Sequence, residues 1–206
     1  YTNVLLHTLN GFMVYVLAFF FFKRWYLSLF SGILFITHPV QTEAVAWISG
    51  RNDIIVTFFS LLTILSYRYL HTLTGIRRKI TFVAFIIFYG CALFSKESGM
   101  ILLLLIILLD YFFQPMSLTD SNSRRKAYLT MVLLSLLYFC IRTMVLGQVG
   151  MPAAIPVEES GYGFLKVPVI YAYYFKMIVL PVTQTAIPLI PSCITVKNAT
   201  FITSCM

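Results

Sequence analysis

The chain has 206 residues, of which 60% are hydrophobic and only 11% are charged. A water-soluble domain carries about a quarter charged residues, because its surface must face water, so this composition excludes a soluble globular protein. The formal net charge of +8 does not indicate a nucleic-acid binder. The basic residues stand in short clusters between apolar runs, which is typical of topology determinants in membrane proteins.

Seven apolar runs predict an all-α fold, a polytopic transmembrane helical bundle with about seven spans. The first run ends at a Lys-Arg pair, and the short second run stops at a His-Pro pair. In chain order the runs cover residues 4–22, 26–37, 54–70, 80–94, 99–113, 127–146 and 167–182. We expect one membrane domain over residues 1–190 and an unassigned tail over residues 191–206. Because the chain begins at Tyr1 with residues that already belong to a run, we expect a segment to precede it.

The connections between runs alternate in charge, and this predicts the orientation of the chain. Every second connection is basic and contains Lys23-Arg24, Arg77-Arg78-Lys79 or Arg124-Arg125-Lys126. The connections between them hold acidic and basic residues together. Short basic loops stay in the cytosol, so we expect Tyr1 and the mixed connections on the luminal or outer face.

The mixed connection from His38 to Asp53 is the richest in polar residues. Pro39 suits the first turn of a helix, and the residues after it predict a short helix along the membrane interface, with Trp47 at headgroup depth. On one continuous helix Glu43 and Arg51 would lie about 80° apart in projection and about 12 Å apart along the axis. They would then line one groove without pairing.

The side chains of Arg51 and Asp53, two positions apart, would point in nearly opposite directions on a helix. One would face a cavity and the other would fix packing. Two interpretations stay open for this stretch: its charged residues anchor helix ends at the interface by extending their charged groups toward water, or they bind a ligand.

A second mixed connection, Ser95 to Gly99, contains Lys96 and Glu97. A lysine at membrane depth is costly and often marks a ligand or ion path. The alternative is a helix-capping turn, with Ser95 as the cap, Gly99 relieving crowding and Lys96 merely exposed.

The remaining polar residues predict no further site. The three histidines and the four cysteines show no metal-ligand spacing, so we expect neither a metal site nor a disulfide framework. His7, inside the first run, is expected to be a packing residue with a satisfied ring. Asp110, near a cytosolic helix end, is expected to face solvent. Tyr171, Tyr173, Tyr174 and Lys176 are typical of an interfacial belt.

The two mixed connections resemble those of the transmembrane and tetratricopeptide-repeat containing O-mannosyltransferases, multi-span glycosyltransferases of the GT-C class. The resemblance rests on the order of His38–Asp53 and Ser95–Gly99, the second followed by a Leu-rich run ending at Asp110-Tyr111. Leu5–Asn10 is similar to the opening of the family's second span, and Tyr173–Val182 to its segment after the fourth luminal loop. Together these cover about residues 1–190.

The resemblance implies transfer of a sugar, typically mannose, from a polyprenyl-phosphate donor to protein Ser or Thr hydroxyls on the luminal face. It implies inversion at the anomeric carbon, no metal and no cofactor beyond the donor. The expected location is the endoplasmic reticulum membrane, or the inner membrane of a bacterium. By resemblance, Arg51 and Lys96 face the donor phosphate, where cations stabilise an anionic leaving group. The implied supporting residues are His38, Glu43, Asp53 and Glu97.

The chain departs from the family pattern at three places. The acidic catalytic motif of the class lies in a luminal loop before the span that opens this chain, so the catalytic base is expected upstream of Tyr1. The tetratricopeptide array that normally follows is not in this sequence, and Gln41 stands where the family often has His. The chain alone is therefore expected to be inactive.

A second interpretation is a non-catalytic membrane protein, either a transporter or a lipid-binding pseudoenzyme. Charged residues at membrane depth also occur along transport paths. Transporters are built from repeats with broken helices, and no internal repeat is evident in this sequence.

Overall fold

The computed structural model describes residues 1–47, 50–113, 121–146 and 163–179. Over these ranges all regular structure is helical, and the described residues contain no β-strand. This confirms the all-α prediction. The chain divides into two compact units, Tyr1–Pro156 and Val157–Met206.

The helices of the first unit match the predicted runs closely. The unit contains α1 (Thr2–Phe22), α2 (Trp25–Thr37), the 3-10 helix η1 (Pro39–Gln41), α3 (Thr42–Ala46), α4 (Arg51–Leu70), α5 (Gly75–Ser95), the 3-10 helix η2 (Glu97–Met100), α6 (Ile101–Phe113) and α7 (Ser121–Leu146).

Four of the described helices, α1, α4, α5 and α7, are long and apolar enough to cross a membrane. They have 20 to 26 residues, and about 20 are needed to span the hydrocarbon core. Helices α2 and α6 have 13 residues each. Each predicted run therefore coincides with a helix, but seven crossings are not confirmed.

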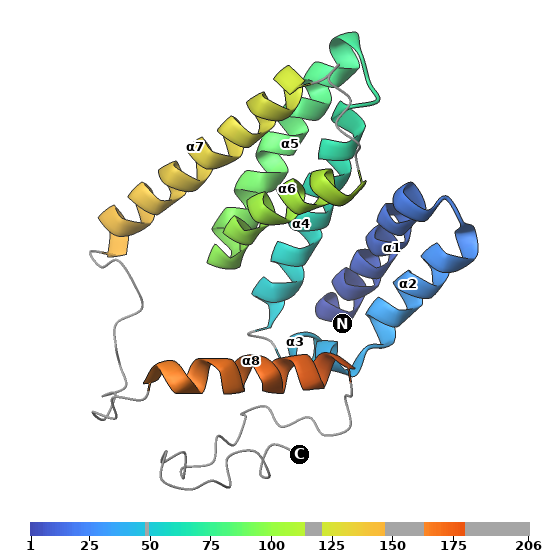
Figure 1. The fold of residues 1–206 in the computed structure, drawn as a ribbon, viewed down its shortest axis with the longest axis vertical. Coiled ribbons are helices and arrows are strands. Elements are labelled where there is room, and N and C mark those ends of the chain that lie inside the picture. Colours follow the sequence, from blue (N-terminus) through green and yellow to red (C-terminus); the bar gives the residue numbers. More distant parts are fainter. Residues whose placement is uncertain (48–49, 114–120, 147–162, 180–206) are drawn as a thin grey trace, which may run out of the picture. The chain divides into compact units, whose positions relative to one another are not determined.

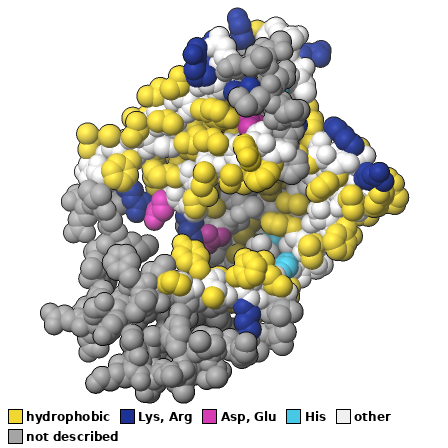
Figure 2. Space-filling model, in the orientation of Figure 1, with side chains coloured by type: hydrophobic (Ala, Val, Ile, Leu, Met, Phe, Trp, Pro, Cys, Tyr) yellow, Lys and Arg dark blue, Asp and Glu magenta, His cyan; other side chains and the backbone are white. Residues whose placement is uncertain are grey.

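Three helix pairs build the first unit: α4 packs along α5, and α1 packs along both α2 and α4 (Figure 1). The apolar core lies among α4, α5, α6 and α7, where Tyr67, Phe85, Tyr89 and Ile106 are almost completely buried. Elsewhere hydrophobic side chains cover much of the described surface (Figure 2). Such a surface is ordinary in lipid and unfavourable in water, in agreement with a membrane protein.

Helix α1 carries a stripe of buried polar side chains at Asn3, His7 and Asn10. Their spacing of four and three places them on one helix face. The His7 Nε2 lies 3.2 Å from the Ile36 carbonyl oxygen, and the Asn10 amide donates to the Ile54 carbonyl at 3.0 Å. The stripe therefore joins α1 to the end of α2 and the start of α4, and His7 is the satisfied packing residue that the sequence predicts.

Asp110 is not solvated, contrary to the prediction. Its side chain is buried at the end of α6 and accepts hydrogen bonds from the hydroxyls of Tyr67 in α4 and Tyr128 in α7. A buried carboxylate needs such donors, because an unpaired charge is very costly away from water. Asp110 thus joins three helices.

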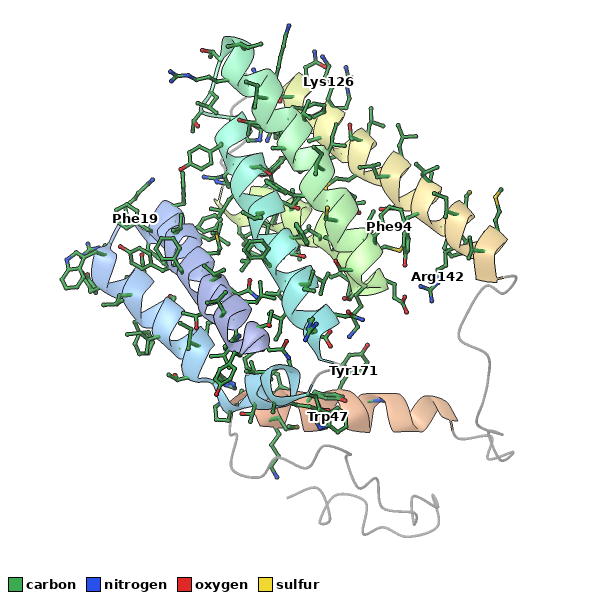
Figure 3. The ribbon with its side chains drawn as sticks, turned by 180° about the vertical axis from the view of Figure 1, so that it is seen from behind. Phe19, Trp47, Phe94, Lys126, Arg142 and Tyr171 are labelled. Atoms are coloured by element: carbon green, nitrogen blue, oxygen red, sulfur yellow. The ribbon has the colours of Figure 1, made fainter. Side chains whose placement is uncertain are left out.

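The basic clusters of the first unit lie at the helix ends remote from the mixed connections. The ring of Phe20 in α1 contacts Tyr69 in α4 at 5.1 Å, so the end of α1 before Lys23 lies beside the end of α4. Lys126 and Arg142 mark opposite ends of α7 (Figure 3). This arrangement agrees with the alternating charge pattern, although it leaves the assignment of the basic side to the cytosol as a prediction.

The described part of the second unit is α8 (Gly163–Val179), with Pro168 inside it. Tyr171, Tyr174 and Phe175 are exposed. The predicted boundary at residue 190, the tail 191–206 and the end of the predicted seventh run lie outside the described residues.

Candidate functional site

The first predicted stretch begins where α2 ends. Helix α2 ends at Thr37, and His38 follows with an extended backbone. The His38 Nδ1 accepts a hydrogen bond from the Val40 amide at 3.2 Å. Pro39 opens η1, as its fixed φ favours. His38 therefore caps a turn, and this is the position in which the structure places that predicted supporting residue.

The stretch contains a short helix, as expected, but it does not form one continuous helix, which was the condition for Glu43 and Arg51 to line one groove. Helix α3 ends at Ala46, Trp47 has an extended backbone with φ −87° and ψ 136°, and α4 begins afresh at Arg51. The side-chain amide of Asn3 donates hydrogen bonds to the Val45 and Trp47 carbonyl oxygens, at 3.3 and 3.0 Å. In an unbroken helix those carbonyls would accept from the following turn. The projected relation of Glu43 to Arg51 is therefore not realised.

Gly50 allows the backbone to fold tightly at this break. A Cβ at position 50 would lie 2.5 Å from the Ala44 carbonyl oxygen and 2.8 Å from its Cα, closer than side chains pack. The absence of a side chain lets the start of α4 fold back against α3. This close approach places Glu43 and Asp53, ten positions apart in sequence, on the walls of one groove.

Arg51 is held by α1 rather than by an acid. Its Nε donates to the Asn3 Oδ1 at 3.3 Å, and Arg51 forms no ion pair with any residue that the structure describes. A guanidinium has five N–H donors in a rigid fork. Its remaining donors are thus available to an anion.

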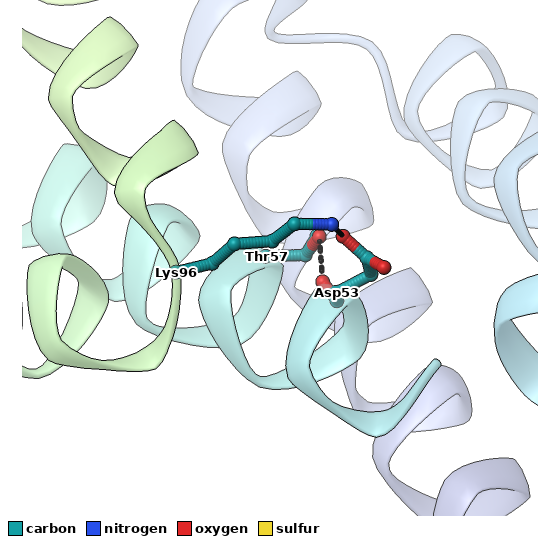
Figure 4. Close-up of polar contacts among 3 residues, drawn as sticks. All are labelled: Asp53, Thr57 and Lys96. Carbon is teal, nitrogen blue, oxygen red and sulfur yellow. Dashed lines mark hydrogen bonds and ion pairs between the residues drawn. The ribbon is translucent and has the colours of Figure 1, made fainter. Parts of the chain in front are cut away.

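Lys96 crosses from the end of α5 to the first turn of α4, where its Nζ pairs with Asp53 Oδ1 (Figure 4). The two side chains are 42% and 47% exposed. Thr57 Oγ1 donates to the Asp53 backbone carbonyl at 2.7 Å one turn later. Lys96 is therefore not merely an exposed residue of a capping turn, and Ser95 does not act as a cap, because its hydroxyl donates to the Cys91 carbonyl within α5.

The turn after Lys96 packs tightly on α5. A Cβ at Gly99 would lie 2.9 Å from the Ala92 carbonyl oxygen, so the predicted role of Gly99 in relieving crowding is confirmed. Glu97 forms an ion pair with Arg142 of α7, which also donates to the Tyr138 hydroxyl at 3.1 Å. Sequence reasoning did not single out Arg142. The sequence signal that could have found it is a lone arginine near the end of the predicted run 127–146 that lies opposite the basic cluster, on the same predicted side as Glu97.

The structure thus brings some predicted site residues together and separates others. Asp53 forms an ion pair with Lys96, whereas Glu97 forms one with Arg142 of α7. The convergence of Arg51 and Lys96 on one groove stays a prediction, although the partner of Lys96 is two positions from Arg51. Acidic side chains lie beside basic ones between hydrophobic areas of this face (Figure 2).

A groove of about 280 Å³ lies beside the Lys96–Asp53 pair. Its walls come from η1, α3 and the start of α4. It is lined by Val40, Glu43, Ala44, Trp47, Gly50 and Asp53.

The fold and these residues define a helical membrane protein with a cluster of ionised side chains where the mixed connections meet. Charged side chains within a membrane are rare and usually functional.

Curated proteins similar to this chain carry the name protein O-mannosyl-transferase. One from Caenorhabditis elegans is 26% identical over 193 residues, which are 87% of this chain and 25% of that protein. Protein O-mannosyl-transferase TMTC2 of Homo sapiens is 33% identical over 42% of this chain and 11% of its own length. A Drosophila melanogaster protein of the same name, Tmtc1, is 36% identical over 52% of this chain and 12% of its own. These similarities confirm the resemblance found in the sequence.

The chain spans at most about a quarter of the length of the relatives named here. No family model matches the chain, and no solved structure matches it.

Proposed function

We propose that the chain is part of a protein O-mannosyltransferase of the endoplasmic reticulum membrane, and that its mixed connections bind a polyprenyl-phosphate mannose on the luminal face. The acceptor is a Ser or Thr hydroxyl of a protein. Its oxygen bonds to the anomeric carbon while the bond from that carbon to the phosphate oxygen breaks. Polyprenyl phosphate leaves, and the hydroxyl proton passes to a carboxylate base, which the resemblance assigns to the segment before Tyr1.

This proposal rests on the hydrogen bonding of Arg51. Its guanidinium is oriented by Asn3 through one nitrogen and is not neutralised by any described carboxylate. A guanidinium matches the geometry of phosphate oxygens and binds them through paired hydrogen bonds. Arg51 is therefore prepared to hold the phosphate of the donor and, during transfer, the charge of the leaving group.

Lys96 supplies the second cation of the proposed phosphate site. Its partner Asp53 is about half exposed, and exposed ion pairs contribute only about 0–1 kcal/mol. A phosphate therefore displaces Asp53 from Lys96 at little cost. The Lys96 ammonium then stabilises the negative charge that develops on the phosphate as the sugar leaves.

The full-length protein that contains this chain tests the proposal. Membrane fractions with polyprenyl-phosphate mannose and an acceptor protein should transfer mannose. Arg51→Ala and Lys96→Ala should each lower the rate by about 10²–10³, as loss of one transition-state contact does. Lys96→Arg should recover part of the rate, because the charge remains while its geometry changes.

Arg77→Ala serves as the matched control, because Arg77 is an exposed cation in the first turn of α5, at the opposite end of that helix from Lys96. It should transfer like the wild type. A lipid-binding pseudoenzyme would bind the donor without transferring mannose. Wild-type turnover in a well-inserted Lys96→Ala protein would exclude the phosphate role.

A further inference from the structure

The groove beside the Lys96–Asp53 pair has walls of unlike chemistry. Its lining combines Trp47, which is 60% exposed, with the two acidic residues Glu43 and Asp53. Val40, Ala44 and Gly50 complete the lining with small apolar surface. An open groove with one aromatic wall and two acidic groups is unlike the uniformly apolar groove that a lipid chain would need.

The two carboxylates keep acceptor capacity. The side chain of Glu43 forms no hydrogen bond or ion pair with any residue that the structure describes. Asp53 bonds to Lys96 through Oδ1, and no described residue donates to its Oδ2. An ionised carboxylate has about four acceptor positions, and its hydrogen bonds to hydroxyls are short and strong. The groove therefore favours a ligand with several hydroxyl donors.

The indole favours a ligand with a C–H face as well. The face of an aromatic ring is electrically negative, so it attracts the weakly positive hydrogens on one side of a sugar ring. A pyranose combines such a face with hydroxyls around its edge. The volume of about 280 Å³ lies just below the usual range for ligand pockets of about 300–1,000 Å³, which suits a single sugar ring.

Asp53 belongs both to this groove and to the ion pair with Lys96. In the proposed function Lys96 binds the donor phosphate, so the groove lies directly beside the proposed phosphate site. Resting on that proposed function, we propose that the groove binds the mannosyl ring of the donor. Trp47 lies against its C–H face, and Glu43 and Asp53 accept hydrogen bonds from its hydroxyls.

Three lipid probes separate sugar binding from phosphate binding in the full-length protein. They are polyprenyl-phosphate mannose, polyprenyl phosphate without sugar, and a polyprenyl-linked amine of equal chain length. Glu43→Gln should weaken binding of the mannose donor about tenfold to hundredfold, the value of a hydrogen bond to a charged group, and Trp47→Ala should weaken it too, because the aromatic face is lost. Both variants should bind polyprenyl phosphate like the wild type.

Two matched variants control for folding. Trp47→Phe keeps an aromatic face and should retain most of the preference for the mannose donor. Trp25→Ala removes the other tryptophan of this chain, which is 65% exposed, and should change neither affinity. The Trp47 carbonyl that Asn3 binds persists in every variant, so the α3–α4 break is retained.

The outcomes distinguish the two proposals. If the wild type binds neither phosphate lipid, the proposed function fails. If it binds both, but Trp47→Ala and Glu43→Gln weaken them equally or not at all, the sugar site alone is overturned. Tighter binding of the amine probe than of the mannose donor, lost in Glu43→Gln, would also overturn it, since a cation would then be the preferred ligand.

Discussion

Lys96 and Asp53 form an ion pair across 43 positions of sequence, between the end of α5 and the first turn of α4. Neutralising the acid frees the ammonium. Asp53→Asn should therefore strengthen binding of sugar-free polyprenyl phosphate severalfold and change the free energy of unfolding by no more than about 1 kcal/mol. Vesicle binding and thermal unfolding in detergent measure the two effects. Weaker phosphate binding by a stable Asp53→Asn protein would contradict the displacement of Asp53 by phosphate.

Asp110 should matter for stability rather than for ligand binding. Asp110→Ala leaves the hydroxyls of Tyr67 and Tyr128 without their acceptor, and each such buried group costs about 1–3 kcal/mol. Asp110→Asn keeps one acceptor oxygen and should be milder. The midpoint of thermal unfolding in detergent gives the order. If Asp110→Ala unfolds with the wild type, the contact with both tyrosines does not stabilise the bundle.

The close contact of Gly50 with Ala44 should make position 50 intolerant of a side chain. Gly50→Ala forces the backbone of α3 away from α4 and should reduce donor binding at least tenfold, since it deforms the groove wall. Gly90→Ala is the control. A Cβ at Gly90, within α5, would meet nothing within 4 Å, so this change should be neutral or stabilise the helix by up to about 1 kcal/mol. Equal donor binding by both variants would count against the groove.

The orientation of the chain is testable by cysteine accessibility in sealed vesicles. The starting protein has the four cysteines of this chain replaced by serine. Thr42→Cys, exposed in α3, and Thr74→Cys, exposed before α5, should be labelled from opposite sides, with Thr74→Cys reached from the cytosol. Labelling of both from one side would reject the orientation drawn from the basic loops.

The helices of this fold could be predicted from the sequence because each depends on a local property. Apolar runs bounded by Lys-Arg or His-Pro pairs gave segments that all became helices, and Pro39 begins a turn as its ring geometry favours. Whether α2 and α6, with 13 residues each, cross a bilayer is not a local property. It depends on tilt and on neighbouring helices.

The contacts of the site could be predicted only in part. Lys96 and Asp53 were both candidates, but a single sequence does not reveal that their side chains pair over 43 positions. Arg142 and Asn3 were missed for the same reason, since their partners lie 45 and 48 positions away. The break after Ala46 was missed because it depends on Asn3 of another helix. Asp110 was misjudged because two tyrosines, unremarkable in sequence, satisfy it.

The polar stripe of α1 contacts four backbone carbonyls of its neighbours, besides the Arg51 side chain that donates to Asn3. Every amino acid carries that carbonyl, so these hydrogen bonds do not depend on the side chains at the acceptor positions. Random mutagenesis should therefore show that the acceptor positions tolerate substitution better than the donor positions. Substitutions of similar size and polarity at the acceptor positions should leave membrane insertion and folding intact, whereas changes at the donor positions should abolish them. The acceptors are Ile36, Val45, Trp47 and Ile54, and the donors or ring partners are Asn3, His7 and Asn10.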